Sequence, residues 1–336
     1  MNSAFSDLHE VLLISSQPLD SDSIASGTIL KKYLQSKKVN VKHIFPKELR
    51  EKEKEAFIHL PFFDEFTGVD SREFLKETTY DAVILVDGSN EIQFYDYENT
   101  DLPAPDFSEH AKIIVVDHHP TDNPNLGNTI IKNKKASSAT EVVLTDIVPT
   151  EFLDRDLAML AYAGIVGDTG NFQWNFTPST MRLAADLLEK GAEPIQITER
   201  YFRDKPVEYF DMLSFAIEHT EYLDEIQTQL FVLSYNSIQE HNLDKDRLSL
   251  VKYAFKSALS GFVKGYPRGI MVTEFEPGKL SVSGRGSNIY NKISLPELFK
   301  EMGGNGGGHF NSAGMGINMD IEEFRIKLFD TIKKLM

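Results

Sequence analysis

The feature that most constrains this fold is a series of short, unbroken apolar runs in the first half of the chain. Runs without polar alternation are typical of strands buried on both faces, as in a parallel sheet between layers of helices. We therefore predict an α/β fold whose N-terminal domain has a parallel sheet with helices on both faces. The predicted strands are 11–15 (VLLIS), 39–45, 82–86 (AVILV) and 113–116 (IIVV).

Helix signals suggest how the rest of the chain is divided. Ser138 and Glu141 form a capping box, which predicts a helix start at that point. Helical spacing of apolar residues covers 156–165, and a later helical pattern stops at Gly191. We predict three parts: a catalytic domain over 1–190, a helical connector over 191–222, and a smaller α/β domain over 223–336 that binds the substrate.

The last third of the chain has its own strand and helix signals. A turn over 276–279 joins two predicted strands, and Ser294 begins another capping box. Apolar residues at helical spacing predict a final helix from about Ile321 onward. The predicted strands of this part are 230–234, 269–274 and 279–283.

Composition narrows the classes of function. The formal charge is −16, and such an acidic surface repels the backbone of long duplex nucleic acid. The chain has no cysteine, which excludes disulfides, thiol catalysis and zinc–thiolate sites. It has no apolar run of about 20 residues, as a bilayer span needs, and its N-terminus lacks the pattern of a signal peptide. We expect a cytoplasmic protein that binds a small anionic substrate, and neither long duplex nucleic acid nor a membrane.

Acidic and imidazole side chains follow the predicted strands and one helix. Because ligands of an open parallel sheet bind outside the carboxyl ends of its strands, these groups should meet in one crevice. Unpaired buried carboxylates cost roughly several kcal/mol each, and divalent cations remove that conflict. The groups are Asp20 and Asp22 after the first run, Asp87 after the third, Asp117, His118 and His119 after the fourth, and Asp168 after a helical segment that ends at Gly167.

The ligand types favour a metal site, although a structural reading exists for some residues. Oxygen and nitrogen ligands without sulfur suit Mn²⁺, Mg²⁺ or Fe²⁺, with Zn²⁺ possible. Two ions about 3.5–4 Å apart would activate a shared water and bind phosphate oxygens. Taken singly, Asp20, Asp22 or Asp87 could instead cap a helix or a turn. The triplet at 117–119 has no such simple explanation, and the four segments together favour the metal site.

These segments resemble the four motifs of the DHH phosphoesterases, which are named after the triplet. The motifs occur in the family order, and the stretch 303–314 (GGNGGGHFNSAG) resembles the signature of the smaller domain that follows in many members. The stretch 136–141 (ASSATE) is similar to that of the nanoRNase and pAp-phosphatase branch. The resemblance implies hydrolysis of short oligonucleotides, 3′-phosphoadenosine 5′-phosphate (pAp) or linear and cyclic dinucleotides, commonly with manganese.

The resemblance also implies a two-ion centre with divided roles. Asp117 would orient His118, as ligating imidazoles generally require, and His119 would face the phosphate. Mn²⁺ is the expected ion, and Mg²⁺ is an alternative. One ion would be held by Asp22, Asp87, His118 and Asp168, and the other by Asp20 and Asp87, which bridges the two.

One position departs from the family pattern. The first motif usually reads His-x-x-Pro-Asp-x-Asp, and here Ser16 stands where the family has the histidine, with the proline one place early. Because neutral serine is a poor metal ligand, we expect the ion at Asp20 to be held weakly, with altered metal preference or reduced activity. His43, at the end of another predicted strand, is a conceivable substitute.

The second domain is expected to bind the substrate phosphate. Glycines let backbone N–H groups approach an anion, so 303–308 is either a phosphate cradle or a flexible loop after a helix. The family resemblance favours the cradle. Arg285 lies between glycines and matches a family arginine, which predicts a bidentate phosphate clamp. Trp174 is expected in the core rather than as a base-stacking platform. The predicted substrate-binding residues are Arg285, Ser287, Gly306, Gly307, Gly308 and His309.

Three functions fit this sequence. The leading one is a metal-dependent phosphodiesterase or phosphomonoesterase for short oligonucleotides, pAp or dinucleotide-derived substrates, with His119 and Asp117 as its catalytic residues. The second is a nucleotide sensor with weakened catalysis, and its motivation is Ser16. The third is an inorganic pyrophosphatase or polyphosphatase, which shares the first domain but usually carries a different second one.

Overall fold

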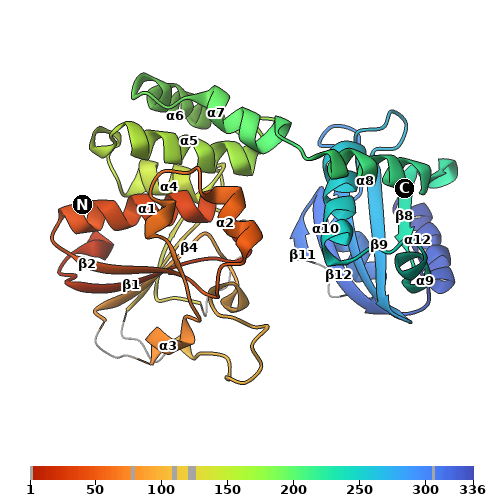
Figure 1. The fold of residues 1–336 in the computed structure, drawn as a ribbon, viewed down its shortest axis with the longest axis horizontal. Helices are drawn as coiled ribbons and strands as arrows, with labels where there is room; N and C mark the ends of the chain where they lie inside the picture. Colours follow the sequence, from red (N-terminus) through yellow and green to blue (C-terminus); the bar gives the residue numbers. More distant parts are fainter. Residues whose placement is uncertain (1–2, 77–79, 108–111, 120–125, 305–306) are drawn as a thin grey trace. The chain divides into compact units, whose positions relative to one another are not determined.

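The computed structural model describes residues 3–76, 80–107, 112–119, 126–304 and 307–336. The chain divides into two compact units, an N-terminal unit over Met1–Arg203 and a C-terminal unit over Asp204–Met336 (Figure 1). Between Ala192 and Tyr222, α7 (Pro194–Thr198) and the π-helical turn η6 (Glu199–Arg203) belong to the first unit, and α8 (Val207–Glu218) belongs to the second. None of the described helices is long and apolar enough to span a bilayer.

The sheet of the N-terminal unit confirms the predicted α/β fold. Its described strands are β1 (Glu10–Ser15), β2 (Asn40–Phe45), β3 (Thr67–Gly68), β4 (Ala82–Val86), β5 (Ile113–Asp117) and β6 (Thr129–Lys132). They lie in the order β3-β2-β1-β4-β5-β6, and every neighbouring pair is parallel. The four predicted strands are the four inner ones, β2, β1, β4 and β5. The two edge strands were not predicted, because β3 has two residues and β6 has only two apolar residues between Thr129 and Lys132.

Helices cover the two faces of this sheet unequally. Val11 and Leu13 of β1 face the layer formed by the helices α1 (Ser21–Ser36), α4 (Ala139–Asp146) and α5 (Arg155–Thr169) (Figure 1). Leu12 and Ile14 face the other side, where short helices and connecting segments complete the apolar cluster. The helices and turns are α1 (Ser21–Ser36), α2 (Glu51–Phe57), α3 (Arg72–Leu75), α4 (Ala139–Asp146), α5 (Arg155–Thr169), α6 (Pro178–Glu189), η1 (Ser3–Phe5), η2 (Phe63–Glu65), η3 (Glu91–Phe94) and η5 (Thr150–Phe152).

The C-terminal unit has a mixed sheet. Its described strands are β7 (Thr220–Leu223), β8 (Thr228–Leu233), β9 (Arg268–Glu276), β10 (Lys279–Gly286), β11 (Gly307–His309) and β12 (Ser312–Asn318). They lie in the order β11-β12-β10-β9-β8-β7, with β8 and β9 parallel and the other neighbours antiparallel. The predicted strands correspond to β8, β9 and β10, and the predicted turn joins β9 to β10.

Different helices pack on the two faces of this second sheet. Met271 of β9 belongs to the apolar cluster formed with α8, α10 (Lys245–Ala254) and the π-helical turn η8 (Phe255–Leu259). The next residue, Val272, belongs to the cluster formed with α11 (Leu295–Glu301) and α12 (Ile321–Leu335). Side chains therefore alternate between the two helical layers along β9, as the geometry of a strand requires. The remaining elements are α9 (Tyr235–Glu240) and η7 (Asp224–Ile226).

Candidate metal centre and phosphate-binding residues

Four of the five predicted metal ligands of the N-terminal unit meet at one edge of its sheet. β1, β4 and β5 are neighbours in the sheet, so their carboxyl ends meet at one edge. Asp22 stands in the first turn of α1 after β1, Asp87 follows β4, and His118 follows β5. Asp168 reaches the same place from the last turn of α5, which packs against α1.

His118 lies at the centre of this group. Its Nε2 atom is 3.0 Å from Oδ2 of Asp168 and 3.6 Å from Oδ1 of Asp87. One ligand atom each from Asp22, His118 and Asp168 lies within 4.8 Å of the others, and the same holds for Asp87, His118 and His119. Burial alone would lower the pKa of His118, but the hydrogen bond and charge of Asp168, with the charge of Asp22, raise it to about 9.

The N-terminus of α4 holds the carboxylate of Asp22. Its Oδ2 accepts a hydrogen bond from the backbone N–H of Ala139 at 2.6 Å, and its Oδ1 accepts one from Thr140 at 2.8 Å. A helix start offers unpaired N–H groups and a partial positive charge, so it both orients and stabilises a carboxylate. Even so, burial and the charge of Asp168 raise the pKa of Asp22 to about 6. The helix start therefore leaves part of the negative charge at this site uncompensated.

Asp87 has an unusual backbone at the end of β4. Its φ is +64°, in the left-handed region that non-glycine residues seldom occupy. The side chain is buried, and burial together with the charges of Asp22 and Asp20 raises its pKa well above the usual range. The neighbouring Gly88 lies against Ser16, because a Cβ at Gly88 would be 3.1 Å from that of Ser16. The residue that replaces the family histidine is thus buried beside this strand end.

Asp20 has a structural role as well as a predicted catalytic one. Its Oδ1 accepts a hydrogen bond from Ser23 N at 2.8 Å and so caps α1. Burial and the charge of Asp22 raise the pKa of Asp20. Among the described residues, neither of the two clusters of close ligand atoms includes Asp20. The contacts of Asp20 are therefore those of a helix cap, and its role as a metal ligand stays a prediction.

Asp117 orients His119, whereas the family resemblance implied that it would orient His118. Its Oδ1 is 2.7 Å from Nδ1 of His119, and its Oδ2 is 2.8 Å from Nζ of Lys132. Burial opposes ionisation of Asp117, but His119 and Lys132 outweigh it and lower its pKa to about 2. The physical reason is the direction of the chain after β5, which turns the ring of His118 toward Asp168 and the ring of His119 back toward Asp117.

The donor set fits a divalent cation. Within the described ranges, no Lys or Arg side chain forms an ion pair with Asp22, Asp87 or Asp168, although two of these three are almost fully buried. Burial and the charges of neighbouring aspartates raise the pKa of both buried carboxylates, and a cation bound here would favour their charged forms. Carboxylate oxygen and imidazole nitrogen suit Mn²⁺ and Mg²⁺ better than softer ions.

Two of the predicted phosphate-binding residues of the C-terminal unit, Arg285 and His309, lie in one row across its sheet. Arg285 of β10 pairs with Ser312 of β12, and Ser312 pairs with His309 of β11. Gly307, Gly308 and His309 form a short edge strand, so this part of the glycine-rich segment is a strand and not an open loop. Gly306 lies outside the described residues.

Glycine is required at Gly308, and Ser287 has a local partner. Gly308 has a φ of +136°, and a Cβ there would lie 2.1 Å from Ser312 O. The hydroxyl oxygen of Ser287 accepts hydrogen bonds from the backbone N–H groups of Ile289 and Tyr290. Its O–H remains able to donate.

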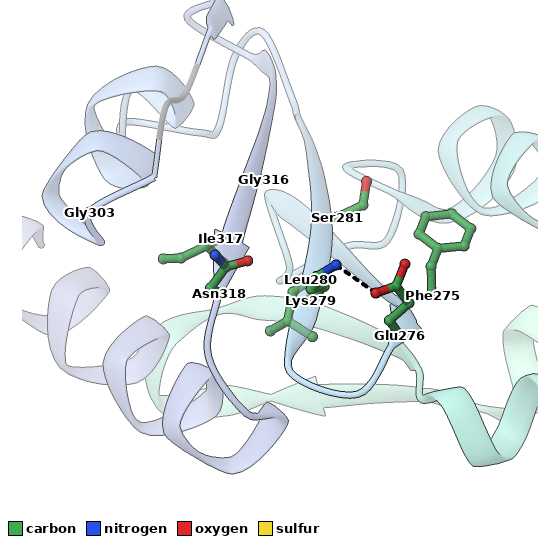
Figure 2. A pocket seen from close by; sticks show the side chains of 9 residues that line it. All are labelled: Phe275, Glu276, Lys279, Leu280, Ser281, Gly303, Gly316, Ile317 and Asn318. Carbon is green, nitrogen blue, oxygen red and sulfur yellow. Dashed lines mark hydrogen bonds and ion pairs between the residues drawn. The ribbon is translucent and has the colours of Figure 1, made fainter. Parts of the chain in front are cut away.

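A surface pocket at the other end of β9, β10 and β12 includes Gly303 of the predicted cradle but none of the six predicted substrate-binding residues (Figure 2). It is lined by Lys279, Glu276 and Asn318, among others. Nζ of Lys279 lies 2.6 Å from Oε2 of Glu276, so the positive charge in the pocket is already neutralised. This pocket therefore does not have the electrostatic character of a phosphate site.

Comparison with known proteins agrees with this geometry. Residues 10–165 match the DHH family, N-terminal domain. The N-terminal part of the chain is a DHH-family domain. The chain is also similar in fold, over 98% of its length and 94% of the other, to an exopolyphosphatase-related protein from Bacteroides fragilis, with a TM-score of 0.77 and 17% identity.

Two curated relatives extend the similarity beyond the DHH domain. One is the bifunctional oligoribonuclease and PAP phosphatase NrnA of Thermus thermophilus, 26% identical over 66% of this chain and 64% of that protein. The other is a membrane protein–large ribosomal subunit bL9 fusion protein of Aster yellows witches'-broom phytoplasma, 25% identical over 82% of this chain and 31% of that protein. The chain thus spans less than two thirds of the length of each.

Several residues that position the candidate metal ligands were not predicted from the sequence. Glu141 is buried, and its Oε2 accepts hydrogen bonds from Ser137 N, Ser137 Oγ and Thr180 Oγ1 at 2.7–2.8 Å. This network fixes the segment before α4 and so fixes the N–H groups that hold Asp22. From the sequence, Glu141 is the last residue of a capping box. That local pattern does not predict its hydrogen bond with Thr180.

Gly164 and Gly167 allow α5 to approach the DHH site closely. A Cβ at Gly164 would lie 2.5 Å from Thr140 Oγ1 and 3.3 Å from Asp22 Oδ1. A Cβ at Gly167 would lie 2.1 Å from Ser21 Oγ. Their spacing of three residues on a helix is the signal that could have identified this close-packed face.

Two minor predictions for the DHH domain fail. His43 does not replace the missing histidine ligand: its Nε2 is 3.0 Å from Ser15 Oγ, its ring packs edge-on against Phe66, and burial lowers its pKa to about 3. Trp174 is not a core residue, since 37% of it is exposed. Its indole N–H donates to Asp168 O at 2.9 Å, where Gly170 leaves room for the ring.

Proposed function

We propose that this chain is a metal-dependent phosphoesterase that hydrolyses phosphate esters of short oligonucleotides or of small nucleotides such as pAp. The convergence of Asp22, Asp87 and Asp168 on His118 carries the proposal. Buried acids with raised pKa values and no Lys or Arg partner among the described residues favour a bound cation. The DHH-family match and the similarity to the oligoribonuclease and PAP phosphatase of Thermus thermophilus support the reaction class.

The side chains have distinct roles in this proposal. Asp22, Asp87, His118 and Asp168 would hold Mn²⁺, with Mg²⁺ as the alternative, and Asp20 would help to hold a second ion. The ions would activate water as the nucleophile and neutralise phosphate charge. Asp117, kept ionised by Lys132, would fix the ring of His119 through Nδ1. The ring of His119, held in this way, would face the substrate phosphate.

The C-terminal unit supports a nucleotide as the substrate. Arg285 has no acidic partner among the described residues, and its Nη1 donates only to Gly284 O at 3.0 Å. Tyr290 and Phe310 are exposed on two loops that hydrogen bonds of Asn311 hold together. An unpaired guanidinium and exposed aromatic rings in the same unit suit a phosphate attached to a base, because bases stack on such rings.

The proposal is tested by hydrolysis assays with pAp, pApA, short RNA, short DNA and pyrophosphate in Mn²⁺, Mg²⁺ or EDTA. We expect Mn²⁺-dependent release of mononucleotide or phosphate from the nucleotide substrates. Asp87→Asn and His118→Ala should each lower kcat/KM by more than about 100-fold, corresponding to several kcal/mol of lost transition-state stabilisation. Asp186→Asn, which removes an exposed carboxylate from α6, is the matched control. Full activity in both site variants, or faster release from pyrophosphate than from every nucleotide, would contradict the proposal.

A second candidate function, a nucleotide sensor, is favoured by Ser16. The residue is buried beside Gly88 and offers only a neutral hydroxyl where the family has a histidine. In this case calorimetry would show tight binding of pAp or a dinucleotide in Mn²⁺, with no product after long incubation. Steady turnover excludes the sensor, and restoration of activity by Ser16→His would show that the serine is the cause of weak catalysis.

A further inference from the structure

The C-terminal unit contains a second cation on the same sheet face as Arg285. Arg285 pairs with Gly269 of β9, and Ser283 pairs with Met271, which belongs to the apolar cluster under α10 and η8. Because paired residues in a sheet point to the same face, Arg285 lies on the face that these helical elements cover. Lys256 belongs to η8 itself.

Direct contacts fasten η8 to the strand end that carries Arg285. The hydroxyl of Ser260, which directly follows η8, lies 3.0 Å from Gly269 O and 3.3 Å from Arg285 O. A Cβ at Gly261 would lie 3.0 Å from Ser287 N and 3.1 Å from the carbonyl carbon of Gly286. The turn that presents Lys256 is therefore held against the end of β10.

Lys256 and Arg285 are desolvated cations without an acid. Burial lowers the pKa of Arg285, and burial with the charges of Arg285 and Lys252 lowers the pKa of Lys256 to about 8. In the described part of the chain, neither side chain forms an ion pair, and Lys256 has no hydrogen-bond partner. Half-buried like charges that repel one another are unfavourable unless an anion joins them.

A nearby buried arginine shows what a structural cation looks like in this unit. Arg268 also has no carboxylate partner among the described residues, but it donates to Asn291 Oδ1 at 2.9 Å and to Ile226 O at 2.8 Å. Its hydrogen-bond donors are thus used within the protein. Lys256 and Arg285 leave most of theirs free, which points to a ligand that accepts hydrogen bonds and carries negative charge.

We infer that Lys256 and Arg285 together bind the terminal phosphate of the substrate, and that the pair favours a doubly charged phosphomonoester over a singly charged diester. This inference rests on the proposed function, because it names which phosphate of a nucleotide substrate the C-terminal unit selects. A terminal phosphate carries about −1.5 to −2 at neutral pH. Two adjacent cations match that charge, whereas one guanidinium suffices for a diester.

The test compares pApA with the same dinucleotide whose 5′-phosphate is a methyl ester. Binding of both ligands to the full chain is measured by calorimetry in EDTA at pH 7.5, so that the metal centre does not contribute. Wild type should bind pApA more tightly than the ester. Lys256→Met should reduce this preference by about 10-fold or more, as expected for one charge-assisted hydrogen bond. Lys256→Arg keeps the charge and should retain much of the preference, and the exposed Lys264→Met is the matched control.

Each outcome decides the inference separately from the proposed function. Equal loss of affinity for both ligands in Lys256→Met, the same effect in Lys264→Met, or no measurable binding by wild type would overturn it. If Lys256→Met fails to fold, Lys256→Gln is compared with Lys256→Arg, and a preference that is equal in the two also overturns it. A preference that depends on Lys256 in a chain without Mn²⁺-dependent hydrolysis would support the phosphate site and refute the phosphoesterase.

Discussion

The two units contain unbalanced buried charge of opposite sign. In the N-terminal unit, Asp22 and Asp87 are buried acids whose pKa values are raised. In the C-terminal unit, Lys256 and Arg285 are half-buried cations whose pKa values are lowered. Both shifts disfavour the charged form, so each site is at higher free energy alone than with a ligand of opposite charge.

Ion pairs elsewhere in the chain show the opposite behaviour. Asp117, with His119 and Lys132, has a pKa lowered to about 2. Arg72, which pairs with Asp70 at 2.7 Å, has a raised pKa. Paired groups thus shift toward their charged forms, as expected for interactions that stabilise the fold. The contrast separates charges that belong to the architecture from charges that await a metal ion or a phosphate.

The largest expected effect concerns Mn²⁺ and the N-terminal unit. At about 1,000 times its Kd, Mn²⁺ should stabilise this unit by about 4 kcal/mol, because only the folded chain assembles the ligands. Hydrogen exchange of the full chain should show the gain in α1 and α4 and little change in β9 and β10. Asp87→Asn should lose the gain and, in EDTA, should be more stable than wild type, because one of several like charges is removed. Equal protection of both units by Mn²⁺ would contradict the assignment of the cation site to the N-terminal unit.

A glycine substitution tests how closely α5 must approach the metal site. Gly164→Ala should lower the free energy of unfolding by about 1–3 kcal/mol, because the new Cβ meets Thr140 Oγ1 and Ala25 Cβ at 2.5 and 2.9 Å. Gly316→Ala in β12 is the control, since no atom outside its chain neighbours lies within 4 Å of a Cβ there. Urea unfolding measures both changes. A neutral Gly164→Ala would show that α5 can move away without cost.

Glu141 offers a test of indirect support for Asp22. Glu141→Gln should weaken Mn²⁺ binding by about 10-fold, within the range for residues that orient metal ligands. The carboxamide oxygen is a weaker acceptor than the carboxylate for Ser137 and Thr180, so the N–H groups that hold Asp22 become less well fixed. Calorimetry with Mn²⁺ measures the affinity, and the exposed Glu189→Gln is the control. Unchanged affinity with reduced stability would limit Glu141 to a structural role.

The sequence was informative where local pattern and function coincide. The runs before Asp87 and Asp117 predicted β4 and β5 because buried parallel strands are uniformly apolar. Contacts between residues far apart in the chain could not be predicted where the local sequence of each residue is ordinary. Glu141 reads as part of a helix cap, and only the fold brings it to Thr180. No local pattern distinguishes Lys256, and its partial burial depends on how η8 packs on the sheet.

The smallest expected effect is the pH dependence that Lys256 contributes to stability. Its pKa is about 8 in the folded chain and about 10.4 in an unfolded one, so between these values the unfolded chain binds more protons. The free energy of unfolding contributed by this group therefore rises as pH increases from 8 to 10. Lys256→Met lacks this titration and should be more stable than wild type at pH 7 by about 1 kcal/mol, a typical size for one substitution. Hydrogen exchange of β9 and β10 in EDTA, corrected for intrinsic exchange rates, should show the difference shrinking toward pH 10. A constant difference would mean that packing, and not the buried ammonium charge, accounts for it, and the opposition of charges between the two units would then rest on Arg285 alone.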